Sequence, residues 1–219
     1  MAVTAQLVKE LREMTGAGMM DCKKALVETD GDIDKAVEEL REKGLAKAAK
    51  KAGRIAAEGL VQIAFSDDHK TASVIEVNSE TDFVAKNPEF IEFVDTLAKK
   101  VIEKENPCMD CFMEMPYGDE GTVKDALTNK ISKIGENMNI RRFEKMDTEG
   151  VVYTGYIHGG GKIGVLVGIE TEATAAEIET VGKDVAMQVA SMNPKFVNET
   201  QVDQDWLASE TEIARQLLL

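Results

Sequence analysis

The sequence Glu76-Val-Asn-Ser-Glu-Thr-Asp-Phe-Val-Ala-Lys-Asn87 lies where the chain changes from a strand pattern to a helix pattern. Residues 74–77, Val-Ile-Glu-Val, predict the end of a buried strand. The proline at position 88 closes the segment, because the residue before a proline is disfavoured in helical geometry and Pro88 itself suits the first turn of a helix. Asp82 and Phe83 are therefore predicted to lie on a strand-to-helix connection.

Phe83 has two interpretations at such a position. An aromatic ring beside a carboxylate on an exposed connection is well placed to enter a pocket of another protein. The alternative is a local plug that folds back over its own domain. On residue type and position alone the plug is the commoner arrangement, because loop aromatics usually cover their own core.

The segment resembles, position by position, a signature of the bacterial elongation factor Ts family. A second stretch, Leu11-Arg-Glu-Met-Thr-Gly-Ala-Gly-Met-Met-Asp-Cys-Lys-Lys-Ala-Leu26, is similar to the other signature of that family, and Lys133-Ile-Gly-Glu-Asn-Met-Asn-Ile-Arg-Arg142 also resembles it. Two long signatures in the right order are far more specific than one short motif.

The resemblance implies a guanine nucleotide exchange factor that binds elongation factor Tu, a magnesium-dependent GTPase, and releases its GDP. In that family the Asp-Phe pair, here Asp82 and Phe83, presses into the GTPase beside the magnesium site. The neighbouring Thr81 and Val84 belong to the same contact segment. GDP and Mg²⁺ are held by the partner, so the resemblance implies no cofactor for this chain.

The resemblance assigns further partner contacts outside this segment. The Ile-Gly pair at Ile134 and Gly135 supports the surface around Phe83, and a family histidine that faces the partner matches His158. The Gly-Gly-Gly that follows this histidine is less typical of the family. The second half of the body grips another domain of the partner.

Residues 1–44 predict three short helices, which resemble the ubiquitin-associated type of module that opens this family. The tight Gly-Ala-Gly turn before the second helix exposes Met19 or Met20, although core filling is the commoner role of a methionine. Lys23 and Lys24 follow them and, by the resemblance, belong to the contact that this module makes. Residues 45–58 predict a helical linker rich in Ala and Lys.

The body that follows predicts two copies of one β-β-α unit. Displacing the chain by 92 residues lays 59–80 on 151–172 without a gap, so residues 59–146 and 147–219 are interpreted as two lobes sharing a core. The predicted fold is α+β: a three-helix module, a helical linker, and a two-lobed body with small antiparallel sheets.

The second copy looks incomplete. Its last predicted helix, residues 205–219, is followed by no strand, whereas members of the family continue with a final strand. The open edge would be covered by another chain, which leaves room for a homodimer, or be tolerated, or reflect an incomplete sequence. The alternative function is therefore a binder that stabilises the same GTPase without exchanging its nucleotide.

Composition restricts the classes of function. A net charge of −14 argues against nucleic acid or an anionic membrane as the main partner. Acidic and basic residues balance over residues 1–58, so the acidic excess belongs to the body. The start of the sequence lacks a secretory signal pattern, which predicts a cytoplasmic protein with three free cysteine thiols.

No pattern of catalytic or metal-binding chemistry is convincing. Cys108-Met-Asp-Cys111 has CxxC spacing, but a structural zinc site needs four ligands, so a metal or redox role is the minor alternative. The stretch His158-Gly-Gly-Gly-Lys162 fails as a phosphate loop, because Ile163 stands where Ser or Thr should bind magnesium. The chain is therefore predicted not to be an enzyme.

Overall fold

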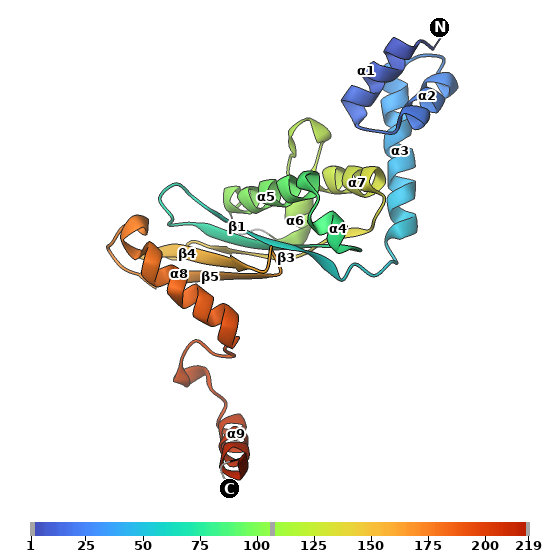
Figure 1. Ribbon diagram of the computed structural model, residues 1–219. Helices are drawn as coiled ribbons and strands as arrows, with labels where there is room; N and C mark the ends of the chain where they lie inside the picture. The colour runs from blue at the N-terminus through green and yellow to red at the C-terminus, as the bar shows by residue number, and fades with distance from the viewer. Residues whose placement is uncertain (1–2, 106–107, 218–219) are drawn as a thin grey trace.

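The computed structural model describes residues 3–105 and 108–217 and has four layers in its body (Figure 1). Helices α5 and α7 cover one face of a sheet β1-β2-β3, the other face lies on a two-stranded sheet β4-β5, and α8 covers that second sheet. The helices are α1 (Ala5–Thr15), α2 (Met19–Glu28), α3 (Ile33–Lys51), α4 (Asp82–Ala85), α5 (Pro88–Glu103), α6 (Met109–Met113), α7 (Val123–Ile134), α8 (Ala175–Met192) and α9 (Gln204–Leu217). The strands are β1 (Glu58–Phe65), β2 (Ala72–Ser79), β3 (Met138–Met146), β4 (Val151–His158) and β5 (Ile163–Glu170), and two 3-10 turns are η1 (Gly118–Glu120) and η2 (Glu199–Gln201).

The first three helices pack around one small apolar core. The Thr4 side chain accepts a hydrogen bond from the Leu7 N–H at 3.2 Å, and Gly16 ends α1 in a left-handed conformation. Asp32 caps α3 in the same way as Thr4 caps α1. The buried core residues are Val8, Leu11, Cys22, Ala25, Leu26 and Ala36.

Helix α3 differs from the predicted division into a third short helix and a separate helical linker. It runs unbroken through Gly44 to Lys51, and residues 52–57 are not helical. A glycine inside a helix costs about 1 kcal/mol, but a side chain at Gly44 would lie 3.7 Å from Ser132 of α7, so packing of α3 on α7 offsets that cost. An ion pair between Arg41 and Asp125, 2.6 Å apart, joins the same two helices. Helix α3 therefore docks the first module onto the body.

The first lobe holds the main core. Strands β1, β2 and β3 pair antiparallel, and α5 lies across them with Phe90, Phe93 and Leu97 fully buried. Pro88 occupies the first turn of α5, as expected, and the Asn87 side chain caps this helix. The Asn106–Pro107 pair at which α5 was expected to end lies outside the described residues, and the helix ends at Glu103.

The prediction of three free thiols was wrong for Cys108 and Cys111, which form a disulfide. Three residues of separation span one helical turn, and the Cα atoms lie 5.1 Å apart, a separation that a disulfide bridges readily. Cys22 is a free thiol buried in the first module. Next to the disulfide, Phe112 is buried and its ring lies 4.8 Å from that of Phe143, which anchors α6 to the body.

The second lobe repeats the first in element order but buries less. The principal apolar cluster contains residues of the first lobe and Ala48, so the expected shared core is instead a core of the first lobe against which the second sheet lies. The two sheets approach closely because glycines face β1: a Cβ at Gly155 would lie 3.0 Å from Ile63 Cδ1, and one at Gly161 2.8 Å from Leu60 Cβ. Among the described residues, β5 pairs with β4 alone.

The chain ends on an exposed helix. Helix α8 stops at Asn193, which adopts a left-handed conformation before Pro194. Helix α9 has no buried residue, and the described termini lie at opposite ends of the molecule in Figure 1. None of the helices described here combines the length and apolar character needed to cross a membrane.

Candidate partner-binding surface

The side chain of Phe83 is 82% exposed, in contrast to the buried rings of α5. It lies on α4, a single helical turn between β2 and α5. The Thr81 side chain caps this turn by accepting from the Val84 N–H at 3.4 Å, and Asn87 caps α5 directly afterwards. The ring of Phe83 thus lies on the solvent-facing side of this capped turn.

Val84 differs from the expectation that it belongs to the contact surface. Its side chain is 6% exposed and packs in the core of the first lobe together with Phe90 and Leu60. Successive residues of one helical turn point in different directions, so the exposure of Phe83 and the burial of Val84 follow from the same geometry. Val84 therefore anchors this turn to the core of the first lobe.

Asp82 is held next to Phe83 by a lysine of the following turn. Its carboxylate accepts a hydrogen bond from Lys86 Nζ at 2.6 Å, and this bond, with the charge of Lys86, lowers the pKa of Asp82. The positive charge of Lys162 lowers it further. Asp82 is therefore ionised at neutral pH and presents its charge beside the ring.

Ile134 and Gly135 lie at the end of α7, directly before the residue that bonds to the Phe83 turn. Gly135 takes a left-handed conformation with φ 90°, which ends α7 and turns the chain towards β3. Ile134 is half-buried against the core. The next residue, Glu136, accepts from both the backbone N–H and the hydroxyl of Thr81, at 3.0 and 2.7 Å. The Ile-Gly segment thus contacts the base of the Phe83 turn through Glu136.

His158 lies at the end of β4 on the hairpin turn of the second lobe. Its side chain is exposed, and Nδ1 lies 2.8 Å from the Tyr156 hydroxyl. In the same turn, Lys162 forms an ion pair with Glu58 at the start of β1. The charge of Lys162 also lowers the pKa of Asp82, the residue next to Phe83.

Met19, Met20, Lys23 and Lys24 form a separate surface on α2. Their side chains are exposed, those of the two methionines by 61% and 64%. Helix α2 packs on α1 and α3, and Figure 1 places it well apart from α4. The residues predicted from the sequence therefore form two surfaces, one on the first module and one on the body.

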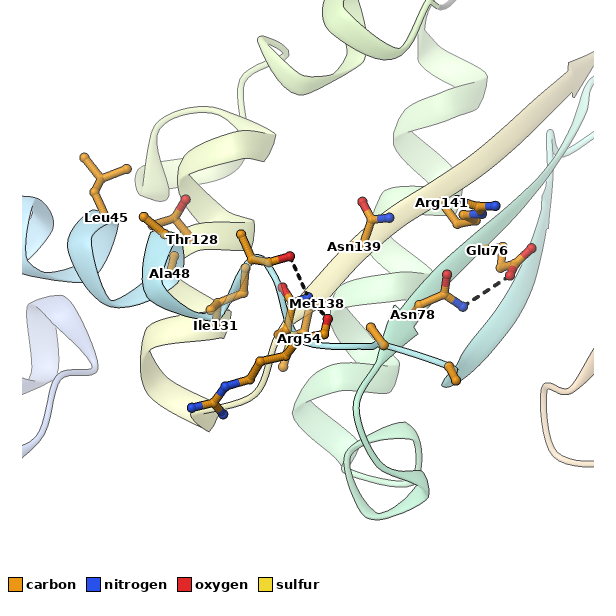
Figure 2. Close-up of a pocket in the computed structure, with 15 residues that line it drawn as sticks. Leu45, Ala48, Arg54, Glu76, Asn78, Thr128, Ile131, Met138, Asn139 and Arg141 are labelled. Carbon is orange, nitrogen blue, oxygen red and sulfur yellow. Dashed lines mark hydrogen bonds between the residues drawn. The ribbon is translucent and has the colours of Figure 1, made fainter.

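A groove of about 810 Å³ lies between the end of α3, α7 and the edge of the first sheet (Figure 2). Its apolar side consists of alanines of α3 and Ile131, and its polar side carries Glu76, Asn78 and Arg141. Two of these polar groups are engaged with each other, since Asn78 donates to Glu76 at 3.2 Å. The groove does not include Phe83 and has no nucleophile beside a base.

Sequence reasoning missed three charged residues around Phe83: Lys86, Glu136 and Lys162. Lys86 could have been found, because it follows Asp82 by four residues, the spacing of ion pairs on a helix. Glu136 and Lys162 come from other elements of the chain, and only the tertiary structure brings them to Thr81 and Asp82.

Comparison with known proteins points to a single family. The family profile described as Elongation factor TS matches residues 80–219. The chain is 56% identical over 217 residues to "Elongation factor Ts" of Clostridioides difficile (strain 630), covering 99% of this chain and 71% of that protein. It is 58% identical over 215 residues to the protein of the same name from Clostridium novyi (strain NT), covering 97% and 70%. A third relative, from Clostridium tetani (strain Massachusetts / E88), is 56% identical over 215 residues, covering 97% and 71%.

Proposed function

Because the chain belongs to the elongation factor Ts family, and is thus a translation elongation factor, we propose that it binds elongation factor Tu carrying GDP and promotes release of the nucleotide. In this role it is an exchange factor rather than a catalytic enzyme, and the magnesium ion and GDP belong to the partner. It acts in the cytoplasm, where translation takes place. The net charge of −14 favours a protein partner over direct contact with RNA.

The observation that carries the proposal is the exposed ring of Phe83 on a turn that Glu136 contacts at Thr81 and Lys86 contacts at Asp82. The ring enters the GTPase between helices beside its magnesium site, and the ionised Asp82 holds the approach. Lys86 shields Asp82 in the free protein and must yield part of this bond when the carboxylate meets the partner. Displacing the elements around the magnesium ion weakens the contacts to the phosphates of GDP.

The free energies require more than one contact surface. Lowering the affinity for GDP a thousandfold needs about 4 kcal/mol of coupling between the two ligands. Burying one phenylalanine side chain contributes roughly 1.5–3 kcal/mol. The surface of α2 with Met19, Met20, Lys23 and Lys24, and the hairpin of His158, supply additional binding free energy that offsets the distortion of the GTPase.

The decisive experiment is stopped-flow release of a fluorescent GDP from elongation factor Tu. Phe83→Ala should slow the stimulated release strongly, because the wedge is removed while its supporting turn remains. Reversing the charges of Lys23 and Lys24 to glutamate should instead raise the concentration of this protein needed for half-maximal release. Stimulated release at the unmodified rate by Phe83→Ala would contradict the wedge mechanism.

The second lobe favours an alternative function. Within the described part of the chain its sheet has two strands where the first lobe has three, and α9 buries no residue. A weakened grip by this lobe would give a protein that binds and stabilises the GTPase without exchange. The open edge of β5 would also admit a second copy of the chain. Binding without faster GDP release would identify the first situation, and a dimer in sedimentation the second.

A further inference from the structure

The turn that carries Phe83 has little stability of its own. Helix α4 comprises four residues, and a helix this short does not persist in water without tertiary support. Its exposed ring adds no burial, so support comes from Val84 below and from polar contacts at the base of the turn. The question is which group fixes the direction of the ring.

Both carboxylate oxygens of Glu136 accept hydrogen bonds at the base of this turn. Oε2 accepts from the Thr81 backbone N–H at 3.0 Å, and Oε1 accepts from the Thr81 hydroxyl at 2.7 Å. The hydroxyl, which donates its hydrogen bond to Glu136, is left to accept one from the Val84 N–H. Glu136 thus sets the orientation of the cap that starts α4.

The segment of Glu136 is held in turn by the segment of Thr81. Glu80 accepts from the Asn137 backbone N–H at 2.5 Å, so each of two adjacent turns offers a carboxylate to the backbone of the other. Asn137 is buried, and its side-chain amide donates to the Arg54 carbonyl at 2.8 Å. Arg54 also pairs with Glu80 at 3.5 Å, which ties the end of the linker to both turns.

We propose that Glu136 is a positioning residue for nucleotide exchange, which acts by holding the Thr81 cap so that Phe83 points outward in the free protein. This inference rests on the proposed exchange function. A fixed ring enters the partner without first losing conformational freedom, which leaves more of the binding free energy for distorting the GTPase. A carboxylate suits this position because it accepts from two donors at once, whereas an amide has one acceptor oxygen.

The variant that isolates this role is Glu136→Gln, which keeps the shape of the side chain and removes one acceptor. It should lower the maximal rate of GDP release roughly tenfold, the order expected when a hydrogen bond to a charged group is lost. The concentration for half-maximal release should change much less, because α2 and the His158 hairpin are untouched. Glu144→Gln is the matched control, since Glu144 lies exposed towards the far end of β3.

A second readout does not depend on exchange activity. Amide hydrogen exchange should become faster at the backbone N–H groups of Thr81 and Val84 in Glu136→Gln, and remain unchanged in Glu144→Gln. Thr81→Val should reproduce the effect at Val84, because it removes the hydroxyl. Thr81→Ser keeps the hydroxyl and should keep the amide protection at Val84.

The outcomes separate this inference from the wedge mechanism. If Phe83→Ala slows GDP release while Glu136→Gln keeps the unmodified release rate and its amide protection, the positioning role is refuted and the wedge mechanism stands. If Phe83→Ala releases GDP at the unmodified rate, the wedge is refuted and with it any positioning role in exchange. In the Phe83→Ala background, Glu136→Gln should have no further effect on the rate, and a full additional tenfold loss would show that Glu136 acts elsewhere.

Discussion

The backbone N–H of Tyr153 in β4 donates a hydrogen bond of 2.8 Å to the carbonyl of His69, which lies in the turn between β1 and β2. Its counterpart 92 residues away is the bond from the Val61 N–H to the Gly161 carbonyl, at 2.7 Å. Position 61 corresponds to 153 and position 69 to 161, so each unit of the repeat places its hairpin turn on the first strand of the other. Two equivalent backbone hydrogen bonds, one from each unit of the repeat, thus connect the two sheets.

The close approach of the sheets predicts that Gly164 tolerates no side chain. A Cβ there would clash with Val61 Cγ1, and the stiff valine side chain of β1 cannot move away easily. Gly164→Ala should lower the free energy of unfolding by about 1–3 kcal/mol in urea titration. Gly53→Ala is the control, because a side chain at Gly53 meets open space. Equal stability of the two variants would mean that the sheets separate freely.

The two phenylalanines on either side of Pro88 should differ in their effect on stability. Phe83→Ala should change the free energy of unfolding by less than about 0.5 kcal/mol, because the side chain is 82% exposed. Phe90→Ala should cost about 3–5 kcal/mol, because the ring is fully buried. Chemical denaturation followed by circular dichroism measures both, and a large loss for Phe83→Ala would show that its ring is part of the core.

The ion pair at Asp82 predicts a shift in its titration. The folded-state pKa lies below the ordinary value of 3.8 because of the bond from Lys86, so Lys86→Ala should raise it towards that value. A depressed pKa means that the pair stabilises the fold above the unfolded pKa and that this contribution is lost as pH falls through the folded pKa. Carboxyl chemical shifts measured by NMR during an acid titration report the change. An unchanged titration in Lys86→Ala would assign the shift to another group.

The cysteines should react as one pair and one protected thiol. With the Cys108–Cys111 disulfide closed, alkylation of the native protein should add no label, because Cys22 is buried. After reduction two labels should enter, and Cys22 should react only on unfolding. Mass spectrometry counts the labels, and Cys111→Ser is the control, with one exposed thiol before reduction. Two labels on the native protein without reductant would show that the pair is open.

Local elements of the fold follow closely from the sequence. The β-β-α unit predicted for residues 59–146 matches the hairpin of β1 and β2, Pro88 predicted the start of α5, and the 92-residue repeat predicted β4, β5 and α8. These features depend on residues close together in the chain, where turn chemistry and side-chain periodicity act directly. The unbroken helix α3 was missed because contacts with α7, remote in sequence, stabilise it past Gly44.

The sequence by itself determined that Asp82 and Phe83 lie on a connection between a strand and a helix, and its similarity to the elongation factor Ts signatures marked them as a contact segment. Only the tertiary structure decided that Phe83 points outward while Val84 points inward, and that Glu136 and Lys162 reach this turn. The physical reason is that burial and hydrogen-bond partners depend on the packing of elements more than 50 residues apart, which local preferences do not specify.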